Sequence, residues 1–176
     1  MPFPIWTSPE KPPPARRRIG SEEVFTRSGD SRSMDIAYIN KLYEEGYDCA
    51  QCVIFALRDR IETDSFDELM RSVSCLGMGL LEGSACGAVL AAYVVIGLKY
   101  GNDRPDFASK GLALIKKEQF MAELRKKHGR GISCPDLMGL DIRNEEDDLK
   151  AHKNNIYTEF CPSLCLDVIS ALDKVI

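Results

Sequence analysis

Cysteines are the residues through which this chain of 176 residues could do chemistry, and it has seven of them. Thiolates bind soft metals and attack disulfides, and an odd number of cysteines cannot all pair within one chain. Four are expected in the first turns of four different helices: Cys49, Cys86, Cys134 and Cys161. The N–H groups and partial positive charge at a helix start favour a thiolate and lower its pKa. If these starts converge, they form a pocket of four thiolates suited to an iron–sulfur cluster or to zinc.

Local capping signals place the first two of these cysteines. Asp48 and Gln51 have the spacing of a capping box, which makes Cys49 the first residue of its helix. Ser84 is the expected N-cap of a very apolar helix that reaches Tyr100, so Cys86 is expected two residues inside it. Glycine beside this cysteine would let backbone approach a sulfur atom closely.

The other two cysteines carry similar signals. Ser133 is the expected N-cap before Cys134, and Asp136 completes a capping arrangement. Cys161 precedes Pro162, and proline favours the first helical position, so Cys161 is expected to be an N-cap itself.

The remaining cysteines leave alternatives open. Cys49 and Cys52 form a C-x-x-C pair, and Cys161 and Cys165 lie four apart, so each pair occupies one helical face. These four could make a different four-thiolate site, or Cys49 and Cys52 could cycle as a disulfide. Cys75, before a glycine-rich turn, is expected to be a packing residue.

The elements that must position these cysteines are helices. Helical periodicity and caps run almost throughout from Ser33, with no convincing strand, which predicts an all-α fold: a compact helical bundle formed by residues 34–176 as a single cysteine-cluster domain. In the long helix after Pro105, the apolar residues Phe107, Leu114 and Met121 recur every seven positions and indicate an amphipathic face.

Residues 1–33 differ in composition. They contain most of the prolines and the basic cluster 16–18, which is typical of an extended arm or a disordered tail. The arm could bind a partner, and Trp6 could anchor it on the body or on a second subunit.

Several classes of function are not supported. The net charge of −4 gives no reason to expect nucleic acid as a partner. The longest apolar run, residues 88–98, is too short to span a membrane, and the proline-rich start lacks the apolar region of a signal peptide, so we expect a cytoplasmic protein. His128 and His152 are not expected to bind metal, and we find neither a nucleotide-binding motif nor an acid–base catalytic set.

Four blocks of the sequence point to a known family. "GYDCAQCVIFAL", "CLGMGLLEGSACGAVLAAYVVIGLKYG", "GRGISCPDLMGLDI" and "CPSLCLDVISAL" resemble, in order and spacing, the redox-active family named for its C_GCAxxG_C_C pattern. The resemblance runs from about Met34 to the C-terminus. One departure is Ala91, where the family's pattern usually has a glycine.

The resemblance implies that the family's four cysteines are Cys49, Cys86, Cys134 and Cys161, and that Cys52, Cys75 and Cys165 are additions. The family is also similar to part of the split-Soret cytochromes, which implies an all-helical fold, a homodimer and an iron–sulfur cluster held by these cysteines. The chain has no C-x-x-C-H motif, so we expect no covalently bound haem.

The sequence therefore supports three hypotheses. The leading one is an electron-transfer or redox-sensing protein, with an unidentified redox partner, that binds an iron–sulfur cluster through the four cysteines. The second is a metal-free thiol–disulfide protein. The third is a structural zinc module or an interaction protein.

Overall fold

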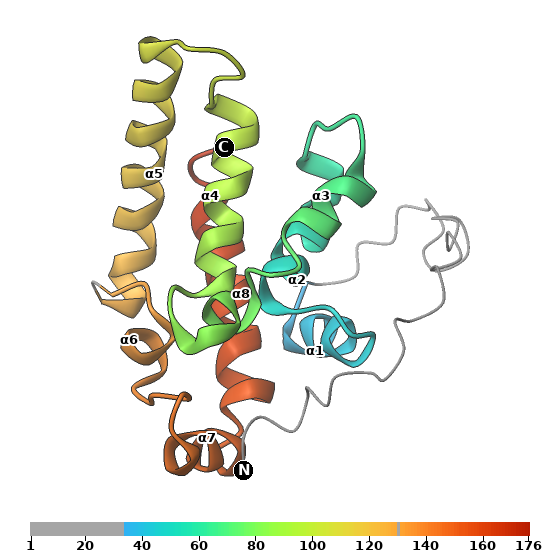
Figure 1. Cartoon of the computed structure of the whole chain (residues 1–176), viewed down its shortest axis with the longest axis vertical. Helices are drawn as coiled ribbons and strands as arrows, with labels where there is room; N and C mark the ends of the chain where they lie inside the picture. Colours follow the sequence, from blue (N-terminus) through green and yellow to red (C-terminus); the bar gives the residue numbers. More distant parts are fainter. Residues whose placement is uncertain (1–33, 130) are drawn as a thin grey trace. The chain divides into compact units, whose positions relative to one another are not determined.

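The computed structural model describes residues 34–129 and 131–176, and these form an all-α bundle, as the sequence predicts (Figure 1). The arm expected at residues 1–33 lies outside the described residues. The α-helices are α1 (Ile36–Glu44), α2 (Cys49–Ala56), α3 (Phe66–Ser72), α4 (Gly87–Tyr100), α5 (Phe107–His128), α6 (Cys134–Met138), α7 (Glu145–Lys153) and α8 (Cys161–Leu172). Three short helical turns, η1 (Arg58–Arg60), η2 (Gly79–Gly83) and η3 (Ile156–Phe160), lie between them.

The C-terminal helix α8 is the centre of the bundle. It packs against α1, α2, α4 and α5, while α4 and α5 lie side by side as a helical hairpin (Figure 1). The interior is made of apolar side chains and contains no buried charged residue among those described. Burial of this surface is the main favourable term in folding, so the core fixes how the helix starts meet.

The helix starts follow the local caps in most places. Asp48 accepts hydrogen bonds from the backbone of Ala50 and Gln51, and the Gln51 side chain completes the predicted capping box. Three expected caps are wrong by one or two residues: the N-caps are Asp35 for α1, Cys86 for α4 and Phe160 for α8. Ser84 therefore does not cap α4, Asp35 caps α1 in place of the serine expected before it at position 33, and Cys161 is the first residue of α8 rather than its cap.

The start of α4 is displaced because its preceding residues form tertiary contacts. An isolated antiparallel bridge pairs Ala85 with Ser133, and its two hydrogen bonds tie residues 84–86 to residues 132–134, so α4 begins only after them. Before the bridge, η2 makes a left-handed turn in which Met78, Leu80 and Leu81 all have positive φ angles. Such angles are costly for residues with side chains, and they persist only where surrounding contacts hold them.

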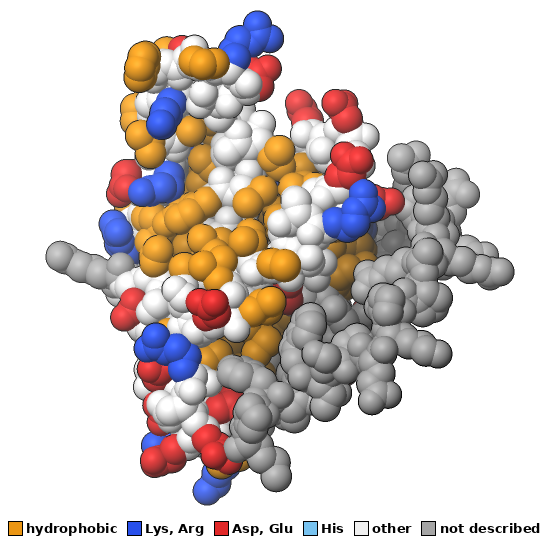
Figure 2. All heavy atoms as spheres, in the orientation of Figure 1, with side chains coloured by type: hydrophobic (Ala, Val, Ile, Leu, Met, Phe, Trp, Pro, Cys, Tyr) orange, Lys and Arg blue, Asp and Glu red, His pale blue; other side chains and the backbone are white. Residues whose placement is uncertain are grey.

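One predicted face of α5 is wrong. Met121 is buried, but Leu114 is exposed and Phe107 is 95% exposed. Figure 2 shows hydrophobic side chains gathered over α4 and the upper end of α5. The first turns of α5 reach beyond the end of α4, and among the described residues no other helix lies over them (Figure 1). Leu114 lies further along and lines an open hollow beside α4. Within the described residues, no helix is long and apolar enough to cross a membrane.

Candidate thiol cluster

The first pair of cysteines meets where α2 and α4 begin. Cys49 opens α2, and its thiol lies against the start of α4: a Cβ on Gly87 would stand only 2.7 Å from the Cys49 Sγ and 2.9 Å from the Gly77 Cα. The backbone N–H groups of Met78 and Ala88 both favour negative charge on this sulfur. Gly87 therefore has the function expected of a glycine beside Cys86, since any larger residue would close the space that the sulfur occupies.

The second pair is assembled by the Ala85–Ser133 bridge. The Cys86 N–H donates to Ile132 O at 2.8 Å, and the Cys134 N–H donates to Ser84 O at 2.8 Å. Cys86 follows Ala85, and Cys134 follows Ser133. Because successive side chains point to opposite faces, both cysteines lie on the face opposite to that of the bridged pair. The Cys134 thiol is close enough to raise the pKa of Cys86.

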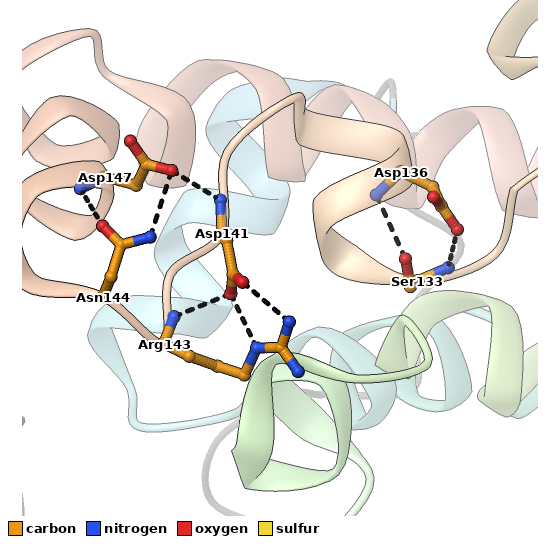
Figure 3. A network of polar contacts seen from close by, with 6 residues as sticks. All are labelled: Ser133, Asp136, Asp141, Arg143, Asn144 and Asp147. Carbon is orange, nitrogen blue, oxygen red and sulfur yellow. Dashed lines mark hydrogen bonds and ion pairs between the residues drawn. The ribbon is translucent and has the colours of Figure 1, made fainter.

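The segment that carries Cys134 is held by polar contacts (Figure 3). Ser133 and Asp136 form a reciprocal capping box at the start of α6, as predicted. Further along, Arg143 makes two side-chain hydrogen bonds to Asp141, and the Asp141 N–H donates to Asp147 at 3.1 Å. These contacts fix the loop between α6 and α7, so Cys134 is presented by a rigid turn.

Cys161 comes from the start of α8 and completes the set. Its thiol lies 3.8 Å from the Met138 Sδ, at the end of α6. Cys49 and Cys86 both act electrostatically on Cys161, and Cys86 also acts on Cys49. The structure thus gathers the four predicted cysteines, from the starts of α2, α4, α6 and α8, in one region. Cys86 and Cys134 are buried, whereas Cys49 and Cys161 are partly exposed.

The three additional cysteines have different positions. Cys165 is fully buried one turn after Cys161 and interacts with Cys49, Cys52 and Cys86. Cys52 is also fully buried, and the thiol that acts on it electrostatically is Cys49. Cys75 is exposed, so its interpretation as a packing residue is wrong. It lies in the turns that follow α3.

The protonation of these thiols differs from the sequence-based expectation. Burial raises the pKa of Cys49 to about 12, with a further contribution from Cys86 and an opposing one from the Met78 N–H. Burial and the thiols of Cys49 and Cys86 likewise raise the pKa of Cys161 to about 12. The neighbouring thiol of Cys134, followed by burial, raises the pKa of Cys86. The helix starts do favour thiolates, but burial and like charges outweigh them, so without a cation these three thiols hold their protons at neutral pH.

The donor set suits a soft metal or an iron–sulfur cluster, because both are held by several cysteine sulfurs. Within the described residues, no three histidine, cysteine, aspartate or glutamate side chains already stand close enough to hold a metal ion. The four cysteines fit such a group by the chemistry of their sulfur donors, and Cys49, Cys86, Cys134 and Cys161 are the residues that would hold it.

Two tyrosines near the cluster were not identified from the sequence. The Tyr43 hydroxyl lies 3.5 Å from the Cys165 Sγ, and the Tyr157 hydroxyl donates to Asp148 at 2.6 Å beside Cys161. No local signal marks Tyr43, since its sulfur neighbour is far away in the chain.

Both histidines have ordinary partners: His128 Nε2 lies 2.8 Å from Asp167 Oδ2, and the His152 ring packs on the Tyr157 ring. In these contacts, the partners of the two histidines are thus an aspartate and a tyrosine, not a cysteine.

Fold and site together define an all-α protein whose helix starts meet in a cluster of thiols. The chain belongs to the family described as "Putative redox-active protein (C_GCAxxG_C_C)", whose model matches residues 47–175. This confirms the resemblance seen in the sequence, although the match begins after α1 rather than at Met34. No curated protein and no solved structure matches the chain.

Proposed function

We propose that this protein is a redox protein that binds an iron–sulfur cluster through Cys49, Cys86, Cys134 and Cys161, for electron transfer or redox sensing. The observation that carries the proposal is the convergence of four thiols from four helix starts. When bound, such a cluster supplies one-electron chemistry at a potential set by its surroundings.

The backbone around the thiols suits this role. N–H groups of Met78, Ala88 and Val89 favour negative charge on Cys49 and Cys86. Hydrogen bonds directed at cluster sulfurs raise the reduction potential, because they stabilise the more negative reduced state. One of these N–H groups belongs to Met78, the residue before η2. The left-handed backbone of this turn therefore directs a hydrogen-bond donor at the Cys49 sulfur.

The raised thiol pKa values support metal-type chemistry over nucleophilic chemistry. A thiol that attacks disulfides must be a thiolate near neutral pH, and Cys49 and Cys161 have pKa values of about 12. A bound cation removes both the burial penalty and the repulsion between sulfurs, so it displaces the protons. Uptake should therefore release protons and become tighter as the pH rises.

The test is an absorption spectrum of protein purified without oxygen, with iron, zinc and acid-labile sulfide measured on the same sample. We expect broad visible bands with matched iron and sulfide. Cys86→Ser should abolish them, whereas Cys75→Ser, at an exposed position, should leave them unchanged. A colourless protein with stoichiometric zinc would instead favour a structural zinc site.

A second candidate function rests on Cys86 and Cys134, which the Ala85–Ser133 bridge brings together. In a thiol–disulfide protein, these two thiols would form one S–S bond and pass two electrons and two protons to a disulfide substrate, which is reduced to two thiols. Metal-free protein that fails to take up a cluster, and that shows a two-proton mass change at these two residues on reduction, would put this function first.

A further inference from the structure

We propose that Cys165 is a fifth sulfur ligand of this site, able to take the place of Cys161. The inference rests on the proposed function, because it concerns how the same site holds a metal. It adds a residue outside the four cysteines that the family pattern names.

The position of Cys165 carries the argument. It follows Cys161 by four residues in α8, so the two side chains lie on one face of the helix about 6 Å apart along its axis. Its Sγ lies 3.8 Å from the carbonyl oxygen of Cys49, the residue that opens α2. Cys165 also interacts electrostatically with Cys49 and Cys86, the same two cysteines that act on Cys161.

The two cysteines of α8 have complementary surroundings. Cys161 is partly exposed, and its sulfur faces Met138 at the outer side of the cluster. Cys165 is 0% exposed, and its sulfur faces the backbone of Cys49 inside the bundle. If Cys49 and Cys86 bind a metal, Cys161 would be the partly exposed one of the two possible α8 ligands and Cys165 the buried one.

The Tyr43 hydroxyl is a polar neighbour of the Cys165 thiol. The Tyr43 hydroxyl lies 3.5 Å from the Cys165 Sγ, and it comes from α1, which contributes no cysteine. A hydroxyl directed at a ligating sulfur stabilises the thiolate, and second-layer hydrogen bonds of this kind typically change metal affinity by about 10- to 100-fold. Tyr43 is thus a positioning residue for Cys165.

The test uses Co²⁺ titrations of the full chain, because cobalt–thiolate bands report both affinity and the number of sulfur ligands. We expect Cys161→Ser to keep a Co²⁺ site. The double variant Cys161→Ser/Cys165→Ser should lose it, so that its Co²⁺ affinity falls by about 10-fold or more below that of Cys161→Ser. The matched control is Cys161→Ser/Cys52→Ser, since Cys52 is equally buried but is not proposed as a ligand. This control should bind as Cys161→Ser does.

Tyr43→Phe sharpens the test, because it removes only the hydroxyl. It should weaken Co²⁺ binding about 10-fold in the Cys161→Ser background and leave the wild-type protein nearly unchanged. Where a buried serine unfolds the double variant, as judged by circular dichroism, Cys165→Ala replaces it. Wild-type protein that binds Co²⁺ while Cys161→Ser binds none would overturn the fifth ligand alone. Wild-type protein that binds neither Co²⁺ nor an iron–sulfur cluster would overturn the proposed function and this inference together.

Discussion

The α4–α5 hairpin is built in opposite ways at its two ends. At the cysteine end, α4 opens with buried Cys86, Gly87 and Ala88, and backbone groups there approach sulfur atoms. At the turn end, Leu98 of α4 and Phe107 of α5 are apolar and exposed. The difference shows that an apolar sequence does not by itself create a buried surface. Burial depends on whether another element, here α2 or α8, lies over it.

The largest expected effect separates two phenylalanines of the same helix. Phe120 is 0% exposed and packs edge-on against the Tyr93 ring, whereas Phe107 opens α5 in solvent. Phe120→Ala should lower the free energy of unfolding by about 3–5 kcal/mol, and Phe107→Ala should change it by less than about 0.5 kcal/mol. Urea denaturation of the metal-free protein measures both. Equal losses would show that the turn end is covered in solution.

Two glycines of α4 sharpen the comparison. A methyl group on Gly87 would stand 2.5 Å from Leu76 O and 2.7 Å from the Cys49 Sγ, whereas nothing lies within 4 Å of the same position on Gly97. Gly87→Ala should destabilise the protein by about 1–3 kcal/mol and displace Cys49. Gly97→Ala should stabilise it by about 0.5–1 kcal/mol, because alanine favours the helix.

Thermal melts measure these stabilities, and cobalt uptake of the same two variants separates stability from site geometry. If Gly87→Ala bound cobalt normally, close approach of α4 to the sulfur would not be needed for the site.

Removing the N-cap at either end of the hairpin should produce a smaller difference in stability than the glycine substitutions do. Asp48 caps α2 next to Cys49, and Asp106 caps α5 at the turn end. Asp48→Ala should cost about 1 kcal/mol of global stability, since α2 lies in the core. Asp106→Ala should mainly fray the exposed first turn of α5, which hydrogen exchange detects without a comparable shift in the urea midpoint. A global loss from Asp106→Ala as large as that from Asp48→Ala would contradict this ranking.

The smallest effect is expected at Leu114, which is exposed on α5. Leu114→Ser should change the free energy of unfolding by less than about 0.5 kcal/mol. Analytical ultracentrifugation of the same variant serves as the control for self-association, because the homodimer stays a prediction. A lower sedimentation coefficient than the wild type would mean that this face is buried between copies.

The sequence predicts the capping boxes of α2 and α6 because the residues that form them lie within one turn. It misplaces the start of α4, where the chain is held by the bridge to Ser133, a contact with a distant segment. The same limit explains the exposed face of α5 and the unforeseen partnership of Tyr43 with Cys165. The sequence predicts lowered thiol pKa values because a helix start can be recognised from neighbouring residues. Burial and the other thiols, which raise the pKa of Cys49, depend on distant parts of the chain.

The Ala85–Ser133 bridge also has a consequence for the order of assembly. All of α4 and α5 lies between the two bridged residues, so Cys86 and Cys134 can meet only after the hairpin has closed. Closing that loop costs chain entropy before any contact repays it. During synthesis, Cys86 leaves the ribosome before Cys134 and Cys161, the cysteines that lie near it in the folded protein. If the protein binds the proposed cluster, loading should therefore follow closure of the hairpin and synthesis of α8, which carries Cys161.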